Sequence, residues 1–211
     1  MCGRLRLTYK ISELIEAMKD LKIAGDIRMD PNCAPTDSAL IIAADPNGIP
    51  KSRQAVFGLI PNDAQDRDIS ARLCNARIET AHQKPSFAAA YAKRHCIIPC
   101  SGFYEWRAEN GRKQPYLFSR QDQGTMFLAG LWERWIDPRE QAVYSFTILT
   151  QPAIPPIADY HHRSPLILKD GRQSEWLDRR VRNIQDLRET GEALTVAPAP
   201  IEMNRPTFKN F

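Results

Sequence analysis

Short apolar runs separated by turn residues dominate the hydrophobic pattern of this chain, and they predict a strand-rich protein. Many of the runs are continuously apolar rather than alternating, which is typical of strands buried on both faces. The expected strands are 2–8, 39–44, 54–60, 95–99, 115–118, 126–132, 143–149, 165–168 and a last one within 196–204. The turns "QDQG" (121–124) and "DPRE" (137–140) should join three of them in a meander.

Helical periodicity is confined to a few segments. Ser12 is expected to cap a helix whose buried face carries Leu14, Ile15, Met18 and Leu21. An alanine-rich helix is expected near 87–94, and two more at 173–180 and 183–190. These patterns predict an α+β fold, with a closed or half-closed sheet flanked by helices.

Composition narrows the classes of protein. A length of 211 residues predicts one domain, and 43% apolar with 26% charged residues is ordinary for a globular protein. The chain has no run of about 18 apolar residues, so no membrane span is expected. The N-terminal residues do not resemble a signal peptide, and we therefore expect a cytoplasmic protein. The net charge of +4 permits nucleic-acid binding without requiring it.

Five cysteines, an odd number, do not form a disulfide pattern. His95 and Cys96 with Cys100 could suggest a metal, but no C-x-x-C pair accompanies them, so small buried thiols are the preferred interpretation. We expect no metal and no cofactor.

Four polar stretches interrupt the apolar runs. They are Cys2-Gly3-Arg4, "CNARIET" (74–80), "SGFYEW" (101–106) and "YHHRSP" (160–165). Each has a simple structural explanation: a buried thiol, an exposed arginine in a turn, a solvated glutamate, or loop histidines that point apart in an extended chain. Together they supply a thiol, an amide, a carboxyl, imidazoles and guanidinium groups, an inventory that could form an active site.

The order of these stretches resembles a known family. "MCGR", "GLIP" (58–61), "NARIET" (75–80), "KPSF" (84–87), "SGFYEW", "FTILT" (146–150) and "HHRSPLIL" (161–168) follow one another as in the SOS-response-associated peptidase (SRAP) family of abasic-site processing proteins. The resemblance runs from residue 2 to about 170. It implies a single SRAP domain over 1–211, with a strand-rich pseudo-barrel and a positively charged groove for single-stranded DNA, and we expect a monomer, nucleoid-associated if bacterial.

The resemblance also assigns roles. It implies that Cys2, Asn75, Glu105 and His161 are catalytic, and that the partner is single-stranded DNA containing abasic sites. The residues implied for DNA binding are Arg4, Arg77, Trp106, Thr150 and Arg163.

Chemistry agrees with an N-terminal cysteine as the reactive group. An α-amine with a pKa of about 7.7–8.0 is partly neutral at physiological pH and can attack an aldehyde. The adjacent thiol can then close a thiazolidine, so Met1 must first be removed. Two alternatives stay open: an N-terminal-nucleophile cysteine peptidase, possibly acting only on itself, and a DNA-binding module without catalysis.

The chain departs from the family pattern in two places. Phe57 precedes "GLIP" as expected, but Asn62-Asp63 follow where the family often has an aromatic residue, which puts a base-stacking contact in doubt. The usual "HDRMP" is "HHRSP", so His162 and Ser164 alter the surroundings of His161 and Arg163.

Overall fold

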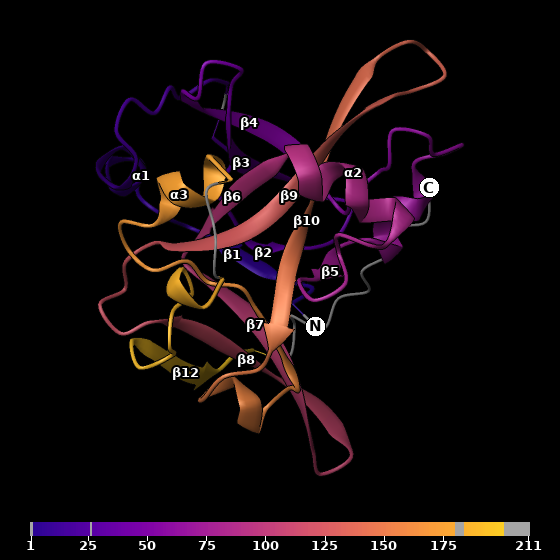
Figure 1. The fold of residues 1–211 in the computed structure, drawn as a ribbon. Helices are drawn as coiled ribbons and strands as arrows, with labels where there is room; N and C mark the ends of the chain where they lie inside the picture. The colour runs from indigo at the N-terminus through magenta and orange to yellow at the C-terminus, as the bar shows by residue number, and fades with distance from the viewer. Residues whose placement is uncertain (1, 26, 180–183, 201–211) are drawn as a thin grey trace.

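The computed structural model describes residues 2–25, 27–179 and 184–200 (Figure 1). Two β-sheets form the body of the molecule. Their strands are β1 (Leu5–Leu7), β2 (Asp30–Cys33), β3 (Ser38–Ala44), β4 (Pro50–Phe57), β5 (Asn75–Arg77), β6 (His95–Cys100), β7 (Gly102–Glu109), β8 (Arg112–Arg120), β9 (Met126–Ile136), β10 (Ala142–Pro152), β11 (Arg163–Pro165) and β12 (Leu194–Pro198).

The larger sheet closes on itself. Its strands follow the order β11-β10-β4-β3-β6-β9, and β9 pairs again with β10, so five strands form a closed barrel. β5 adds to β10 in parallel at the side of this barrel. Closure leaves the five strands without an unpaired edge. The predicted α+β fold with a strand-rich pseudo-barrel core is therefore confirmed.

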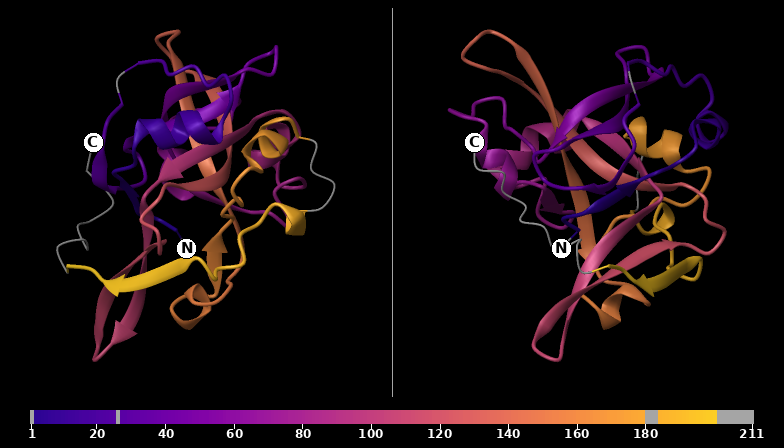
Figure 2. Two further views of the ribbon diagram at one scale, coloured as in Figure 1. Left: turned by 90° about the vertical axis from the view of Figure 1, so that its left-hand side faces the viewer. Right: turned by 180° about the vertical axis from the view of Figure 1, so that it is seen from behind.

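The smaller sheet has the order β12-β8-β7-β1-β2 and carries the N-terminal strand near its centre. Figure 2 shows the β7–β8 hairpin extending away from the barrel, with the N-terminal segment at its base. The predicted three-strand meander is wrong in part. β9 and β10 do form a hairpin through 137–140, but both edges of β8 are taken by β7 and β12, so β9 crosses to the barrel instead.

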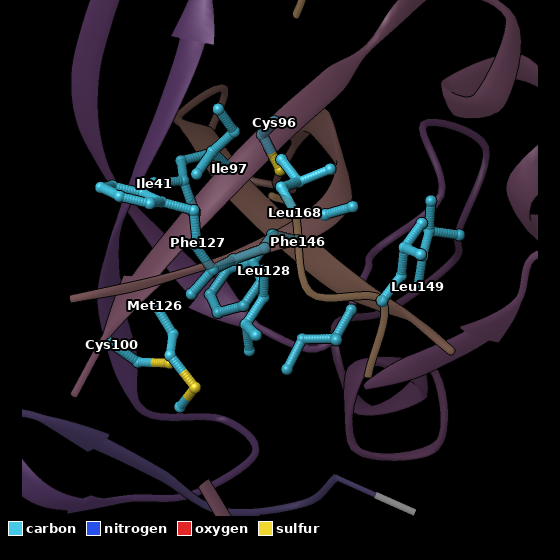
Figure 3. Packing of buried hydrophobic residues seen from close by; sticks show 14 of the residues in the cluster. Ile41, Cys96, Ile97, Cys100, Met126, Phe127, Leu128, Phe146, Leu149 and Leu168 are labelled. Atoms are coloured by element: carbon cyan, nitrogen blue, oxygen red, sulfur yellow. The ribbon is translucent and has the colours of Figure 1, made fainter. Parts of the chain in front are cut away.

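The barrel interior explains the continuous apolar runs. Phe57 and Phe146 stack there with ring centroids 5.1 Å apart, and both side chains are fully buried. Figure 3 shows Ile41, Ile97 and Leu128 from neighbouring strands in the same cluster. Strands such as β6 are buried along nearly their whole length because α2 and α3 contact the outside of the β6–β9 wall.

The α-helices of the described chain are short: α1 (Ile11–Ala17), α2 (Pro85–Lys93) and α3 (Gln173–Leu177). Ser12 lies inside α1 rather than at its N-cap, which is Lys10, and the helix ends before Leu21. α2 begins with Pro85 at its first turn, where a missing N–H costs nothing. No helix of the described residues is long and apolar enough to cross a membrane.

The helix expected at 183–190 is wrong; residue 183 itself lies outside the described chain. The structure has a 3-10 turn, η3 (Ile184–Asp186), because the following backbone pairs with an extended segment. Lys169 N–H donates to Leu187 O at 2.8 Å, and Glu189 N–H donates to Ile167 O at 2.8 Å. These tertiary bonds override local helix propensity. Of the last predicted strand, the part beyond residue 200 also lies outside the described residues.

Candidate active site

The N-terminal segment runs antiparallel to β7. Leu5 faces Phe103 and Arg6 faces Gly102, and Tyr104 N–H donates to Arg4 O at 3.0 Å. Continuing this register places Gly3 opposite Glu105, so Cys2 comes beside the carboxyl-bearing part of β7. Both Cys2 and Glu105 are buried, with exposed fractions of 0% and 2%. Sheet pairing therefore brings together two predicted site residues that are 103 positions apart.

Asn75 reaches the same place from β5. Its Nδ2 donates to Cys2 O at 3.0 Å and lies 3.3 Å from Cys74 Sγ. Its Oδ1 is buried and has no hydrogen-bond partner among the described residues. Asn75 therefore fixes the backbone of Cys2 while presenting one unused acceptor beside it.

Two further predicted site residues lie at the end of β10 and the start of β11. Thr150 faces Arg77 of β5 on one side and Pro165 of β11 on the other. The Arg163 guanidinium donates to both Glu79 carboxylate oxygens, at 2.7 and 2.8 Å, and to Thr150 O at 2.7 Å. This bidentate pair ties the turn after β5 to β11.

His161 is held by the same unit. Arg163 N–H donates to His161 Nδ1 at 3.0 Å. The same Nδ1 lies 3.2 Å from Arg163 O, so either tautomer of the neutral imidazole finds a backbone partner at this residue. Burial lowers the pKa of His161, which favours that neutral form. His161 and His162 do not point apart as expected: they follow the 3-10 turn η2 (Ile157–Asp159), and their rings stack at 4.3 Å.

Burial shapes the electrostatics around Cys2 and Glu105. It raises the pKa of Glu105 to about 7, so this carboxyl exchanges its proton near neutral pH. The pKa of the Cys2 thiol is raised well above its ordinary value, first by burial and then by the charge of Glu105. The thiol is thus held in its protonated form.

The three predicted phosphate-binding arginines differ in environment. Arg77 is exposed at the end of β5. Arg4 is buried, where burial lowers its pKa, and its Nη1 donates to Asn32 Oδ1 at 2.7 Å. Arg163 is buried and paired with Glu79, so its guanidinium does not point at solvent. Of these arginines, Arg77 is the one whose side chain is presented to a ligand from outside.

The other two residues predicted to contact DNA, Trp106 and Thr150, also differ in exposure. Trp106 is half-buried on β7, next to Glu105, whereas the Thr150 hydroxyl is fully buried, within 3.4 Å of Ala76 O and of Arg163. Their contacts with DNA stay predictions. Sequence reasoning assigned no role to Glu79 and did not single out Asn32; the alternation in "NARIET" is a signal for Glu79, but none marks Asn32.

The "GLIP" motif and Phe57 have a structural role. Phe57 is in the barrel core, not at the surface, while Asn62 and Asp63 are exposed. Gly58 has a φ of +119°, and a Cβ atom there would lie 2.1 Å from Ser70 O. Only glycine fits this close approach of two backbone segments.

His95 and its neighbouring cysteines are part of the packing. The two ring nitrogens of His95 lie 3.0 Å from Trp176 O and 2.9 Å from Tyr91 O, while Cys96 and Cys100 are buried in the core. Within the described residues, no group of three or more histidine, cysteine, aspartate or glutamate side chains is arranged to hold a metal ion.

Comparison with known proteins places the chain. The family model described as SOS response associated peptidase (SRAP) matches residues 1–206. The chain belongs to the SRAP family. Two crystal structures have the same SRAP fold. A protein from Bordetella bronchiseptica matches with a TM-score of 0.80 and 25% identity, and the match covers 95% of this chain and 100% of that one. A protein from Bacteroides thetaiotaomicron matches with a TM-score of 0.80 and 23% identity, and the match covers 98% of this chain and 97% of that one.

Relatives within the SRAP family carry informative names. The abasic site processing protein YoqW of Bacillus subtilis is 35% identical over 183 residues, which cover 84% of this chain and 80% of that protein. The abasic site processing protein HMCES of Rattus norvegicus is 30% identical over 154 residues, covering 58% of this chain and 43% of that longer protein.

Proposed function

We propose that this protein processes abasic sites in single-stranded DNA by forming a covalent thiazolidine crosslink through Cys2 once Met1 has been removed. The observation that carries the proposal is the position of Cys2, between the Asn75 amide and a buried Glu105 whose pKa is near 7. The names of the SRAP relatives support the lesion as substrate.

The reaction needs two bonds and releases one water. Hydrolytic removal of Met1 creates the α-amine of Cys2, whose nitrogen attacks the aldehyde carbon of the ring-opened sugar. Loss of water from the resulting carbinolamine gives an imine. The Cys2 sulfur then adds to the imine carbon while its proton passes to the nitrogen, which closes the five-membered ring.

Each neighbouring group suits one step. Glu105, whose pKa burial raises to about 7, can donate to the leaving hydroxyl and accept the proton back. The unused Oδ1 of Asn75 can accept a hydrogen bond from the new amine. The neutral His161 ring is suited to stabilising the developing charge on the sugar ring oxygen by a hydrogen bond as the ring opens.

The cysteine peptidase alternative has less support. A peptidase nucleophile is a thiolate, usually generated by a positively charged neighbour that lowers its pKa. Here burial and Glu105 raise the pKa of the Cys2 thiol. A protonated thiol suits the second, ring-closing step, in which the sulfur delivers its own proton.

The deciding experiment measures the intact mass of the protein after incubation with single-stranded DNA that contains one abasic site. Met1-processed protein should gain the mass of the oligonucleotide minus one water, in an adduct that survives denaturing electrophoresis. Cys2→Ala should form no stable adduct, and Cys2→Ser a weaker one. Lesion-free DNA of the same sequence is the control.

Two outcomes would contradict this chemistry. An equally stable adduct from protein that retains Met1 would point to another nucleophile, such as a lysine. Binding to lesion-bearing DNA without any adduct would favour the non-catalytic DNA-binding module. We propose that the protein acts as a monomer, since one chain supplies every group named above.

A further inference from the structure

A second concave surface lies on the outside of the barrel and takes no part in the proposed chemistry. It is a pocket of about 640 Å³ between the β3–β4 hairpin, the end of α2, Trp132 of β9 and the residues that follow α3. One wall is rigid: His95 stacks on Trp176 with centroids 4.0 Å apart and contacts two backbone carbonyls. We call this the basic pocket.

The basic pocket and Cys2 are at opposite ends of the barrel. His95, which lines the pocket, begins β6, and Cys100, which is close enough to contribute to the raised pKa of the Cys2 thiol, ends it. At about 3.3 Å per residue, these five steps separate the two places by roughly 17 Å. Figure 3 shows Cys96 and Cys100 well apart along this strand. The pocket is therefore a different site from the candidate active site.

Positive charge gathers in this pocket. Five of its lining side chains are basic and two are acidic, so its lining contributes much of the net charge of +4. Lys51 pairs with Asp45 at 2.9 Å and Arg94 with Glu133 at 3.1 Å. Lys93 and Arg179 are exposed, and ion pairs among the described residues engage neither of them. Their charges are available to an anion.

Aromatic rings accompany the charges. The Arg53 guanidinium lies 3.8 Å from the centre of the Tyr144 ring, and the Tyr144 and Trp132 rings are 6.0 Å apart. Trp132 and Tyr144 are half-buried and Arg53 is exposed. Flat π-surfaces beside cations are the combination that binds bases and phosphates of single strands without reading their sequence.

We propose that the basic pocket is a second binding site for single-stranded nucleic acid, with phosphates at Lys93 and Arg179 and a base against Trp132. This inference rests on the proposed function for the identity of the bound strand. If the substrate is lesion-bearing DNA, the basic pocket would hold the part of the same strand that continues beyond the lesion. The protein would then grip its substrate at two points on opposite ends of the barrel.

The test compares two oligonucleotides on Met1-processed protein. Each carries one central abasic site. Single-strand-binding domains cover sites of ~4–16 nucleotides. The short oligonucleotide has about 5 nucleotides, near the lower limit, and the long one has about 30, beyond the upper limit. Equilibrium binding is measured with the Cys2→Ala variant as background, so that no adduct forms. Lys93→Gln/Arg179→Gln should weaken binding of the long strand about 5- to 10-fold and lower its salt slope by about 1.4, since each phosphate contact on a single strand contributes about 0.7.

Matched variants keep the result interpretable. Lys10→Gln/Lys19→Gln removes the same charge at exposed positions just before and just after α1, outside the pocket, and should change the long-strand affinity less than 2-fold. Arg53→Gln, at an exposed position, should weaken long-strand binding about 3-fold. All variants should bind the short strand as their background does.

The proposal is overturned if Lys93→Gln/Arg179→Gln matches the α1 control on the long strand, or if it weakens the short strand equally. It is also overturned if a polyglutamate peptide of equal charge displaces the long strand as well as DNA does, because the pocket would then recognise charge alone. Adduct formation on the short lesion strand, measured by mass in protein with Cys2 intact, reports separately on the proposed function.

Discussion

The two ends of the barrel differ in how far their charged side chains are exposed to water. Around Cys2, the ionisable groups Arg4, Glu105 and Arg163 are more than 90% buried. At the basic pocket, Lys93 and Arg179 are exposed to water. Burial lowers the pKa of Arg4 and raises that of Glu105 to about 7, which suits Glu105 to proton transfer. Exposed cations keep their mobility and act through long-range attraction that salt screens.

This difference indicates which property a substitution should change at each end of the barrel. At the buried end, a change of one atom should alter reaction rate or folding stability, whereas at exposed positions it should alter affinity and its salt dependence. The predictions below run from the largest expected effect to the smallest.

Glu105→Gln should slow adduct formation by about 10²- to 10⁴-fold, because a positioned acid-base group contributes that much. The glutamine amide has nearly the shape of the carboxyl group but cannot donate or accept the catalytic proton. Single-turnover rates followed by denaturing electrophoresis measure this. Glu133→Gln is the matched control, since Glu133 is also 2% exposed but pairs with Arg94 outside the site. Equal slowing in both variants would mean that Glu105 has no special role.

Phe57→Ala should lower the free energy of unfolding by about 3–5 kcal/mol, the usual cost of deleting a buried aromatic ring. Urea denaturation measures it. Because Phe57 is in the core, the folded variant should bind single-stranded DNA with unchanged affinity. A selective loss of DNA affinity at full stability would show that the ring stacks on a base after all.

The pH dependence of stability should carry the signature of Glu105. Its pKa of about 7 in the folded state lies above the unfolded value of about 4.3, so the folded state binds the proton more tightly. This contribution is complete below pH ~4.3 and is lost as pH rises through about 7, in total roughly 4 kcal/mol. Unfolding measured from pH 4 to 8 should show the decline in wild type relative to Glu105→Gln; parallel curves would refute the raised pKa.

Arg163→Lys should cost about 1.5–3 kcal/mol of stability, since a lysine cannot reproduce the bidentate contact with Glu79 and the bond to Thr150 O. It should also shift the pH profile of adduct formation, because loss of the bidentate pair with Glu79 releases the backbone of residue 163, whose N–H bonds to His161 Nδ1. Glu79→Gln should cost less, about 1 kcal/mol, because its side chain is 42% exposed. If the pH profile of Arg163→Lys is unchanged, the pair is structural only.

Arg77→Gln should have the smallest effect. We expect affinity for single-stranded DNA to fall a few-fold, and the salt slope to fall by about 0.7, the contribution of one phosphate contact. Stability should stay within about 0.5 kcal/mol, as for other exposed positions. An unchanged salt slope would exclude a phosphate contact at this position.

Much of the architecture could be predicted from local patterns. Apolar runs predicted most barrel strands within a few residues, because a strand buried on both faces must be apolar throughout. The alanine-rich helix expected near 87–94 is α2, which begins two residues earlier, at Pro85. Local patterns were wrong where tertiary pairing overrode them, as at 187–189, whose backbone bonds to 167–169 prevent a helix, and at β8, whose edges were already occupied.

The sequence by itself determined which chemical groups are available: a thiol at position 2, and an amide, a carboxyl and an imidazole in motifs of the SRAP family. Only the tertiary structure decided how they are used. The pairing of β1 with β7 buries Glu105 beside Cys2, and the Glu79 pair turns Arg163 inward while Arg77 stays outside. The reason is physical: pKa values and ion pairs depend on burial and distance, and these are set by strands brought together from distant parts of the chain.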